Sequence, residues 1–208
     1  MSICRTVKRK ETIYNMRVYY SGAIAVFFFF CFNSLYVIGR SHTDEKAEGI
    51  RGTYPVPPKN ANSLFYIQRS KNTNAIVYEL NKNADGSLNQ QDPVKIYWIR
   101  YAHDSTTADL NYIQQKYAYG LNISALPGNP SQYSMNFVSY AKKKLYLMKR
   151  KDGSGYSTYT QINGKMAVLE SVFITISGGT FWFPKIDDIE LYGYDPESRQ
   201  IVVEHFKP

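Results

Sequence analysis

The chain has 208 residues and a formal net charge of +8. Residues 1–40 hold six of the 25 Lys and Arg but only one of the 17 acidic residues, so the remainder, with nineteen basic and sixteen acidic residues, is nearly balanced. This balance speaks against nucleic acid as a partner, because nucleic-acid-binding domains usually present a basic stripe of their own. Both cysteines, Cys4 and Cys31, precede residue 40, which excludes disulfides, thiolate metal ligands and a catalytic cysteine from the later part of the chain.

The first predicted element is Val18–Ile38, an uncharged run of 21 residues that includes four consecutive phenylalanines. A helix rises about 1.5 Å per residue and a bilayer core is about 30 Å thick, so about twenty apolar residues span it. Basic residues dominate before the run, which predicts a cytoplasmic N-terminus and an exported remainder. The sequence therefore predicts a basic cytoplasmic segment at residues 1–17, a transmembrane helix or signal peptide at 18–39, and a location in the cell envelope.

Two interpretations of this segment remain open. It is either retained as a membrane anchor or removed as a signal peptide by a cut between Gly39 and Arg40. The start is either Met1 or Met16, and the later start leaves a short basic region before the apolar run. In each case the protein meets the membrane through Val18–Ile38, and the domain that follows is single-pass anchored or secreted.

After this segment the sequence predicts a linker at residues 40–63 and a β-rich exported domain at 64–208. Prolines at 55, 57 and 58 favour an extended, polyproline-like linker. The strands are predicted at Leu64–Gln68, Ile76–Leu80, Val94–Tyr101, Tyr133–Tyr140, Lys144–Arg150, Tyr156–Ile162, Lys165–Ser177, Ile186–Tyr194 and Gln200–Phe206. Asn163-Gly164 is the strongest hairpin signal, because both central residues of such a turn need positive φ.

One helix is predicted among these strands. Thr106 is the expected N-cap, and Asp109, three residues on, fits a pattern like a capping box. Leu110, Ile113 and Tyr117 follow at helical spacing, and a left-handed stop is expected at glycine 120. Many short strands with one helix predict a mainly β fold, a single antiparallel sandwich or barrel-like domain.

Four segments resemble a known family. They are Phe65–Asn74, Val77–Asn81, Pro93–Trp98 and Ala118–Gly120. They are similar to an uncharacterised family of bacterial exported domains, domain-of-unknown-function family 4833. The resemblance covers the chain from Leu64 to its C-terminus and implies a domain boundary and an export context. It brings no activity, cofactor or site residue with it.

The sequence predicts no catalytic residue, no metal site and no cofactor. The three histidines lie far apart and lack the short spacing of zinc ligands, and nucleophile-elbow and phosphate-loop motifs are missing. His103-Asp104 fits half of a general-base pair, although a loop cap before the helix is the favoured interpretation. Asp188 and Glu190 share a strand face and would repel unless a cation lay between them, so a solvated edge strand explains them better. His205 is expected to be satisfied or exposed.

The remaining signal is a set of arginine, amide and tyrosine side chains, a composition suited to binding a carboxylate, phosphate or sugar. The candidate ligand-binding residues are Arg69, Asn72, Asn74, Arg100, Tyr101, Tyr117 and Tyr119. The alternative, which the sequence favours, is structural. The tyrosines fill strand positions, and the polar residues hydrogen-bond their own turn.

The leading hypothesis is a membrane-anchored or secreted envelope domain that binds a small polar or anionic ligand, or an envelope protein, without catalysis. A second hypothesis is a hydrolase-like extracytoplasmic enzyme that uses His103 and Asp104, with Arg69 or Arg100 as an anion clamp. A third is a structural component of an envelope complex that makes its contacts through a sheet edge.

Overall fold

The computed structural model describes residues 53–180 and 183–208. The predicted membrane segment Val18–Ile38 lies outside the described residues. Within those two ranges, no helix is long and apolar enough to span a bilayer.

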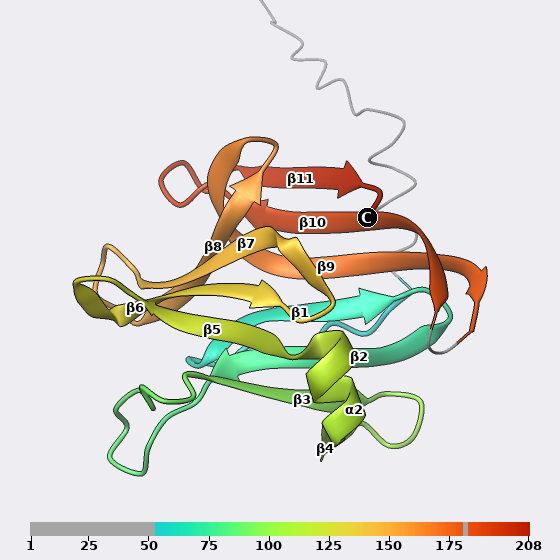
Figure 1. The fold of residues 1–208 in the computed structure, drawn as a ribbon, viewed down its shortest axis with the longest axis horizontal. Helices are drawn as coiled ribbons and strands as arrows, with labels where there is room; N and C mark the ends of the chain where they lie inside the picture. Colours follow the sequence, from blue (N-terminus) through green and yellow to red (C-terminus); the bar gives the residue numbers. More distant parts are fainter. Residues whose placement is uncertain (1–52, 181–182) are drawn as a thin grey trace, which may run out of the picture. The chain divides into compact units, whose positions relative to one another are not determined.

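The described residues form a mainly β domain with one short helical segment, which confirms that part of the predicted fold class (Figure 1). The strands are β1 (Ser63–Arg69), β2 (Asn72–Leu80), β3 (Val94–Arg100), β4 (Thr106–Asp109), β5 (Leu121–Leu126), β6 (Asn129–Phe137), β7 (Tyr140–Lys149), β8 (Tyr156–Ile162), β9 (Lys165–Gly179), β10 (Pro184–Tyr194) and β11 (Ile201–Phe206). The helical segment comprises α2 (Tyr112–Gln114) and the π-helical turn η1 (Gln115–Tyr119).

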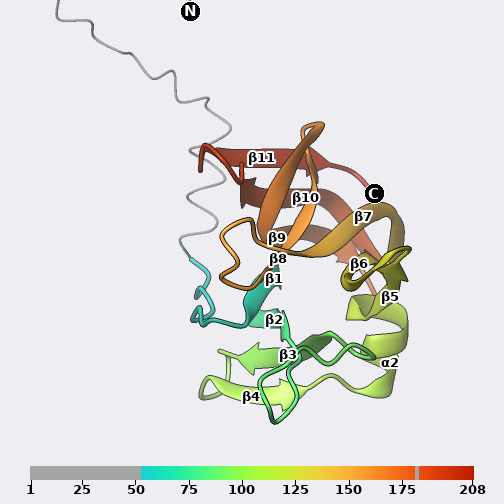
Figure 2. The same cartoon turned by 90° about the vertical axis from the view of Figure 1, so that its left-hand side faces the viewer.

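All strands belong to one sheet, whose main path runs β4-β3-β2-β1-β9-β8-β7-β6-β5, while β10 pairs with β9 and with β11. The sheet is open and strongly curled, with β4 and β11 toward opposite ends in Figure 2. It thus differs from the predicted antiparallel sandwich or barrel. One pairing is also parallel: β1 runs alongside β9 from Tyr66 opposite Ser171 to Arg69 opposite Ile174.

The strand β9 holds this sheet together. Its start pairs with β8, its middle pairs with β1, and its other edge pairs with β10 from Val168 to Gly179. The turn before it has positive φ at both Asn163 and Gly164, 49° and 75°, as the hairpin signal predicts. The predicted strands on either side of that turn are both present.

The helical segment begins later than predicted. Thr106 is no N-cap, because Thr106–Asp109 is β4 and pairs with β3. The N-cap is Asn111, whose side chain accepts a hydrogen bond from the backbone N of Gln114, while the Gln114 side chain accepts one from the backbone N of Asn111. This reciprocal pair is a capping box five residues beyond the predicted one.

Gly120 ends the helical segment in extended backbone, with φ −63° and ψ 163°, so the predicted left-handed stop is wrong. A Cβ at this position would lie 1.9 Å from the carbonyl oxygen of Gln115. The glycine is therefore needed for a close backbone approach inside the π-helical turn rather than for its conformational freedom.

The core lies on the concave side of the sheet and contains an aromatic cluster. Phe65 and Tyr78 stack with ring centroids 4.2 Å apart, and Phe137 meets both rings edge-on at 6.1 and 6.0 Å. Tyr78 is fully buried. Offset-stacked and edge-to-face pairs of this kind contribute about 0.5–1.5 kcal/mol each beyond the apolar area that they bury.

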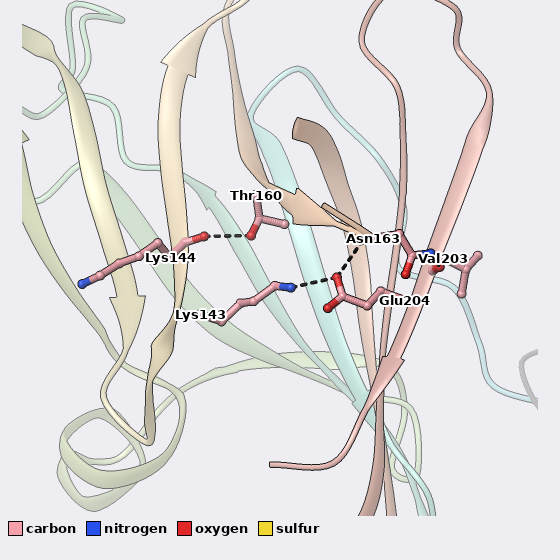
Figure 3. A network of polar contacts seen from close by, with 6 residues as sticks. All are labelled: Lys143, Lys144, Thr160, Asn163, Val203 and Glu204. Carbon is pink, nitrogen blue, oxygen red and sulfur yellow. Dashed lines mark hydrogen bonds and ion pairs between the residues drawn. The ribbon is translucent and has the colours of Figure 1, made fainter. Parts of the chain in front are cut away.

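Side chains tie β11 to β7 and to the β8–β9 turn (Figure 3). Lys143 Nζ lies 2.9 Å from Glu204 Oε2, which also accepts a hydrogen bond from the backbone N of Asn163 at 3.0 Å. The Asn163 side-chain amide donates to the carbonyl oxygen of Val203, and Lys143 Nζ lies 5.4 Å from the centroid of the Phe206 ring. These polar contacts thus hold β7 and β11 together on this side of the curled sheet, since the backbones of the two strands do not pair.

The end of the predicted linker packs on the domain. The Tyr54 ring lies 5.1 Å from the Phe173 ring, and its hydroxyl accepts a hydrogen bond from the backbone N of Lys71. The buried side chain of Gln68 donates to the carbonyl oxygen of Pro55 at 2.7 Å. The folded unit therefore includes residues from position 54 onward.

Candidate ligand-binding site around Arg69

Arg69, the last residue of β1, is surrounded by aromatic rings. Its Nη1 donates a hydrogen bond to the Tyr119 hydroxyl at 2.6 Å. Its guanidinium carbon lies 5.3 Å from the centroid of the Trp98 ring and 5.6 Å from that of Tyr119. The two rings meet edge-on at 5.5 Å. Cation–π contacts at a partly desolvated site of this kind hold the guanidinium in place.

The core fixes the position of Tyr119. The hydroxyl of the fully buried Tyr78 donates to the Tyr119 carbonyl oxygen at 2.7 Å. One residue earlier, the carbonyl oxygen of Ala118 accepts a hydrogen bond from the Ser139 hydroxyl at 2.6 Å. Two carbonyls at the end of η1 therefore receive side-chain donors from β2 and from the β6–β7 turn. π-helical turns occur frequently at functional sites, and this one presents Tyr119 to Arg69.

The helical segment is also attached to β3. The indole Nε1 of Trp98 donates to Gln114 Oε1 at 3.2 Å, and the same oxygen takes part in the capping box of α2. Leu110, just before the segment, is buried in the core. Trp98 consequently has two roles, because its ring contacts Arg69 while its N–H positions α2.

The opposite wall of the site comes from β9 and from the β1–β2 turn. The Ser70 hydroxyl accepts a hydrogen bond from the backbone N of Ile176 at 2.8 Å, and the backbone N of Ser70 donates to the Ile174 carbonyl oxygen. Lys71 has φ of 65° and donates from Nζ to the carbonyl oxygen of Ser177 at 3.1 Å. The turn thus holds the two cations, Arg69 and Lys71, beside β9.

Between these walls lies a cavity of about 450 Å³. Among the described residues, its charged lining side chains are Arg69 and Lys71, and none of them is acidic. Most of the remaining lining is apolar and comes from α2, η1, β9 and β10, including Ile113, Tyr117 and Ile176. Ile113 and Tyr117 are exposed at the rim, where they are 41% and 60% accessible. The cavity therefore combines positive charge with an apolar wall open to solvent.

Burial affects two polar groups at this site, the Tyr119 hydroxyl and the Nε of Arg69. Burial raises the pKa of the Tyr119 hydroxyl, and the positive charge of Arg69 opposes that rise only in part, so Tyr119 is a neutral phenol at physiological pH. The Nε of Arg69 is buried and has no hydrogen-bond acceptor among the described residues. A buried guanidinium N–H without an acceptor is costly, and it is a feature that a bound anion would relieve.

Of the seven candidate residues, the structure brings three to this cavity: Arg69, Tyr117 and Tyr119. Asn72 and Asn74 serve the backbone instead, since the Asn72 side chain accepts from the backbone N of residue 74, whose own side chain accepts from the backbone N of residue 102. Asn72 thus hydrogen-bonds within its own turn, as the structural interpretation expects, whereas Asn74 bonds the β3–β4 turn.

Arg100 and Tyr101 also lie away from the cavity lining. Arg100 is exposed, and its carbonyl oxygen accepts two backbone hydrogen bonds within the β3–β4 turn. The hydroxyl of Tyr101 is buried without a hydrogen-bond partner among the described residues, and burial raises its pKa. Neither residue contributes to the arrangement around Arg69.

The two residues of the hydrolase hypothesis, His103 and Asp104, lie away from the cavity around Arg69. His103 and Asp104 lie exposed in the β3–β4 turn, where Asp104 accepts a hydrogen bond from the Thr106 hydroxyl at 2.9 Å. Neither residue lines the cavity around Arg69. The two residues thus lie in a turn between two strands, and the predicted loop cap before a helix is wrong because Thr106–Asp109 forms β4.

The acidic pair on β10 faces a histidine of β11. His205 Nδ1 lies 2.8 Å from Asp188 Oδ2, and its Nε2 lies 3.6 Å from Glu190 Oε2. The imidazole thus lies between the two carboxylates. The predicted solvated edge strand is wrong, because β10 pairs with β9 and with β11 and the side chain of Glu190 is buried. Over residues 53–180 and 183–208, no group of three or more histidine, cysteine and acidic side chains is arranged to hold a metal ion.

Sequence reasoning missed Trp98, Lys71 and Ile113 as lining or supporting residues of this cavity. Trp98 lies in a predicted strand, and an aromatic ring is the residue type expected beside an arginine. Lys71 follows Arg69 by two residues, and that local pair of cations is a usable signal. Ile113 stands at helical spacing in the predicted helix, but the helix has barely one turn and leaves it exposed.

A family model described as Domain of unknown function (DUF4833) matches residues 65–205. This range begins inside β1 and ends inside β11, and so covers the whole sheet. No curated protein and no solved structure matches the chain.

Proposed function

Since the chain belongs to the family described as Domain of unknown function (DUF4833), whose description carries no activity, we propose a function from the site itself. The domain is a non-catalytic binding module for an amphipathic anion, a molecule with a carboxylate or phosphate head and an apolar chain. It acts in the cell envelope, either anchored to the membrane or secreted.

The observation that supports this proposal is the state of Arg69. Its guanidinium is partly withdrawn from water, forms no ion pair with a carboxylate among the described residues, and keeps a buried Nε without an acceptor. A charge in this state is stabilised when an anion reaches it, because charge-assisted hydrogen bonds strengthen as water is excluded. Lys71, on the same wall, adds a second positive charge.

The rest of the cavity favours an apolar body for the ligand. Its wall is mainly aliphatic and aromatic, and the rim residues Ile113 and Tyr117 extend that surface toward solvent. Small-molecule sites typically combine such walls with a few polar groups that fix orientation. An anionic head at Arg69 would place an attached chain along Ile174 and Ile176 of β9.

The envelope location rests on the sequence of the N-terminal region. Val18–Ile38 has the length and apolar composition of a membrane-spanning helix, and the basic residues before it favour export of the domain. An amphipathic ligand, abundant at membranes, is consistent with that location. Contacts with other envelope proteins are compatible with the same placement.

The proposal is tested by calorimetric titration of the chain from residue 53 with decanoate and with decyl phosphate. Both should bind, and decanol and butyrate, which lack the charge and the long chain respectively, should bind much more weakly. Arg69→Gln should weaken decanoate binding by at least about tenfold, because a hydrogen bond to a charged group contributes about 1.5–3 kcal/mol.

Arg100→Gln is the matched control, because it removes the same charge from an exposed position outside the cavity. A second variant, Tyr117→Ala, changes the rim without touching Arg69 and should weaken decanoate more than butyrate. Equal binding by the Arg69→Gln and Arg100→Gln variants, or no binding of either amphipathic anion, would refute the proposal.

A further inference from the structure

A second groove, which shares no lining residue with the cavity at Arg69, extends along the β7–β8 turn and the β10–β11 turn. It consists of two cavities of about 230 and 470 Å³ that share five lining residues. The shared residues are Arg150, Ser157, Val168, Tyr194 and Arg199. Because the same two arginines line both cavities, they stand at the junction of one continuous groove.

Arg150 is fixed in place by its own turn. Its Nε donates to the Ser157 hydroxyl at 2.9 Å and to the Tyr156 carbonyl oxygen at 3.2 Å, and its Nη1 donates to the Ser154 hydroxyl at 3.3 Å. All three acceptors are neutral. The other N–H groups of its guanidinium have no acceptor among the described residues, so they remain available to a ligand.

Arg199 is held in a different manner. Its guanidinium carbon lies 4.0 Å from the centroid of the Tyr194 ring, a stacked arrangement that leaves the in-plane N–H groups open. Across residues 53–180 and 183–208, neither Arg199 nor Arg150 forms an ion pair with a carboxylate. Two preorganised guanidinium groups thus face the same groove without a counter-charge in contact.

The acidic residues around the groove are engaged elsewhere. Glu170 pairs with Lys59 at 2.6 Å, and Glu197 pairs with Lys151 across the two turns. The carboxylate of Asp152 accepts hydrogen bonds from the hydroxyl and the backbone of Ser154, which lower its pKa, and the positive charge of Arg150 lowers it further although the two side chains form no ion pair. Five basic and two acidic side chains line the two cavities together, so the groove is positively charged overall.

The floor of the larger cavity is apolar. Met148, Tyr159 and Met166 line it beside the arginines, and Met166 is 42% exposed. Methionine side chains adapt to varied apolar partners. A purely polar polyanion such as an acidic sugar would leave this surface unused, whereas a peptide can place an apolar side chain there next to carboxylates.

We propose that this groove binds an acidic peptide segment of a partner protein, with two carboxylates on Arg150 and Arg199 and an adjacent apolar side chain against Met148 and Met166. Arginine matches a carboxylate with two parallel N–H donors, which makes the pair of arginines a specific receptor for such a sequence. The groove is independent of the anion site at Arg69.

The test uses the full-length chain in zwitterionic lipid nanodiscs and a fluorescently labelled peptide of alternating glutamate and leucine. Fluorescence anisotropy should show binding that weakens with salt, and a peptide of alternating glutamine and leucine should bind at least about tenfold more weakly. Empty nanodiscs report any partition of the peptide into lipid.

Arg199→Gln and Arg150→Gln should each weaken binding by at least about tenfold. Arg199→Gln is the decisive variant, because the guanidinium of this exposed residue lies against the Tyr194 ring and takes no part in the turn hydrogen bonds of Arg150. Arg69→Gln is the matched control and should leave peptide binding unchanged, which separates this inference from the proposed function.

Three outcomes would overturn the inference. One is equal binding by the unaltered chain and the Arg199→Gln variant, and another is equal binding of the glutamate and glutamine peptides. The third is preferential binding of oligogalacturonate over the glutamate–leucine peptide, which would assign the groove to an acidic sugar.

Discussion

Tyr78→Phe separates the contribution of one buried hydroxyl from that of the aromatic core. The ring of Tyr78 stacks on Phe65, and its hydroxyl donates to the Tyr119 carbonyl oxygen at 2.7 Å. The substitution keeps the ring contacts and removes the hydrogen bond. Because the side chain is fully buried, bulk water cannot replace that hydrogen bond directly.

The size of the effect follows from that geometry. An unmatched buried polar group costs about 1–3 kcal/mol, and the space left by one oxygen atom is too small for a water molecule, so we expect a loss near the upper half of that range. Tyr112→Phe is the matched control, because this tyrosine is 69% exposed, and its loss should be within about 0.5 kcal/mol.

Equilibrium unfolding in urea measures both free energies. Tyr78→Phe should also weaken decanoate binding, because the hydroxyl fixes the end of η1 from which Tyr119 reaches Arg69. A Tyr78→Phe variant as stable as the Tyr112→Phe variant would refute the reasoning that connects the core to the site.

The remaining predictions concern single positions. Gly120→Ala should lower the free energy of unfolding by about 1–3 kcal/mol because its Cβ would overlap a backbone carbonyl, whereas Gly178→Ala, with open space around it, should be nearly neutral in urea titrations. Glu204→Gln should cost about 1–2 kcal/mol by losing a half-buried ion pair, while Glu197→Gln, in a fully exposed pair, should cost under about 0.5 kcal/mol. Burial raises the pKa of Tyr97 from 10.0 to about 12. Because Tyr97 ionises at lower pH in the unfolded chain than in the folded one, its contribution to the free energy of unfolding is intact below pH 10 and is lost between pH 10 and about pH 12. A Tyr97→Phe variant should lose less stability than the unaltered chain over that interval in alkaline unfolding experiments.

Local turn chemistry made part of the fold predictable. Asn163-Gly164 accepts positive φ at both positions, and the strands on either side of it begin and end at that turn as expected. In residues 121–125 apolar residues alternate with polar ones, a pattern that indicates a strand where β5 lies and that none of the predicted strands includes.

The helix boundary shows where local reasoning failed. Two successive capping patterns are present, Thr106 with Asp109 and Asn111 with Gln114, and local sequence favours neither. Pairing of residues 106–109 with β3 decides between them, because it uses the threonines as strand residues. That pairing depends on tertiary context.

Residue type indicated part of the candidate site but not its arrangement. Arginine, amides and tyrosines predicted a polar–aromatic site, and of these residues Arg69, Tyr117 and Tyr119 lie around one cavity whereas the asparagines do not. Arg69 meets Tyr119 fifty residues away through a π-helical turn, which no local pattern announces. In sequence, Asn74 cannot be told from a ligand-binding amide. Its side chain accepts a hydrogen bond from the backbone N of residue 102, and this bond exists only once the β3–β4 turn has formed.

The parallel pairing of β1 with β9 has a consequence for the order in which the domain folds. Tyr66 finds its partner Ser171 only after more than half of the chain has been made. Until then one edge of β1 presents unpaired amides, and such edges invite pairing with other chains. The N-terminal half of this domain is therefore the part that most needs a chaperone, until β9 pairs with β1.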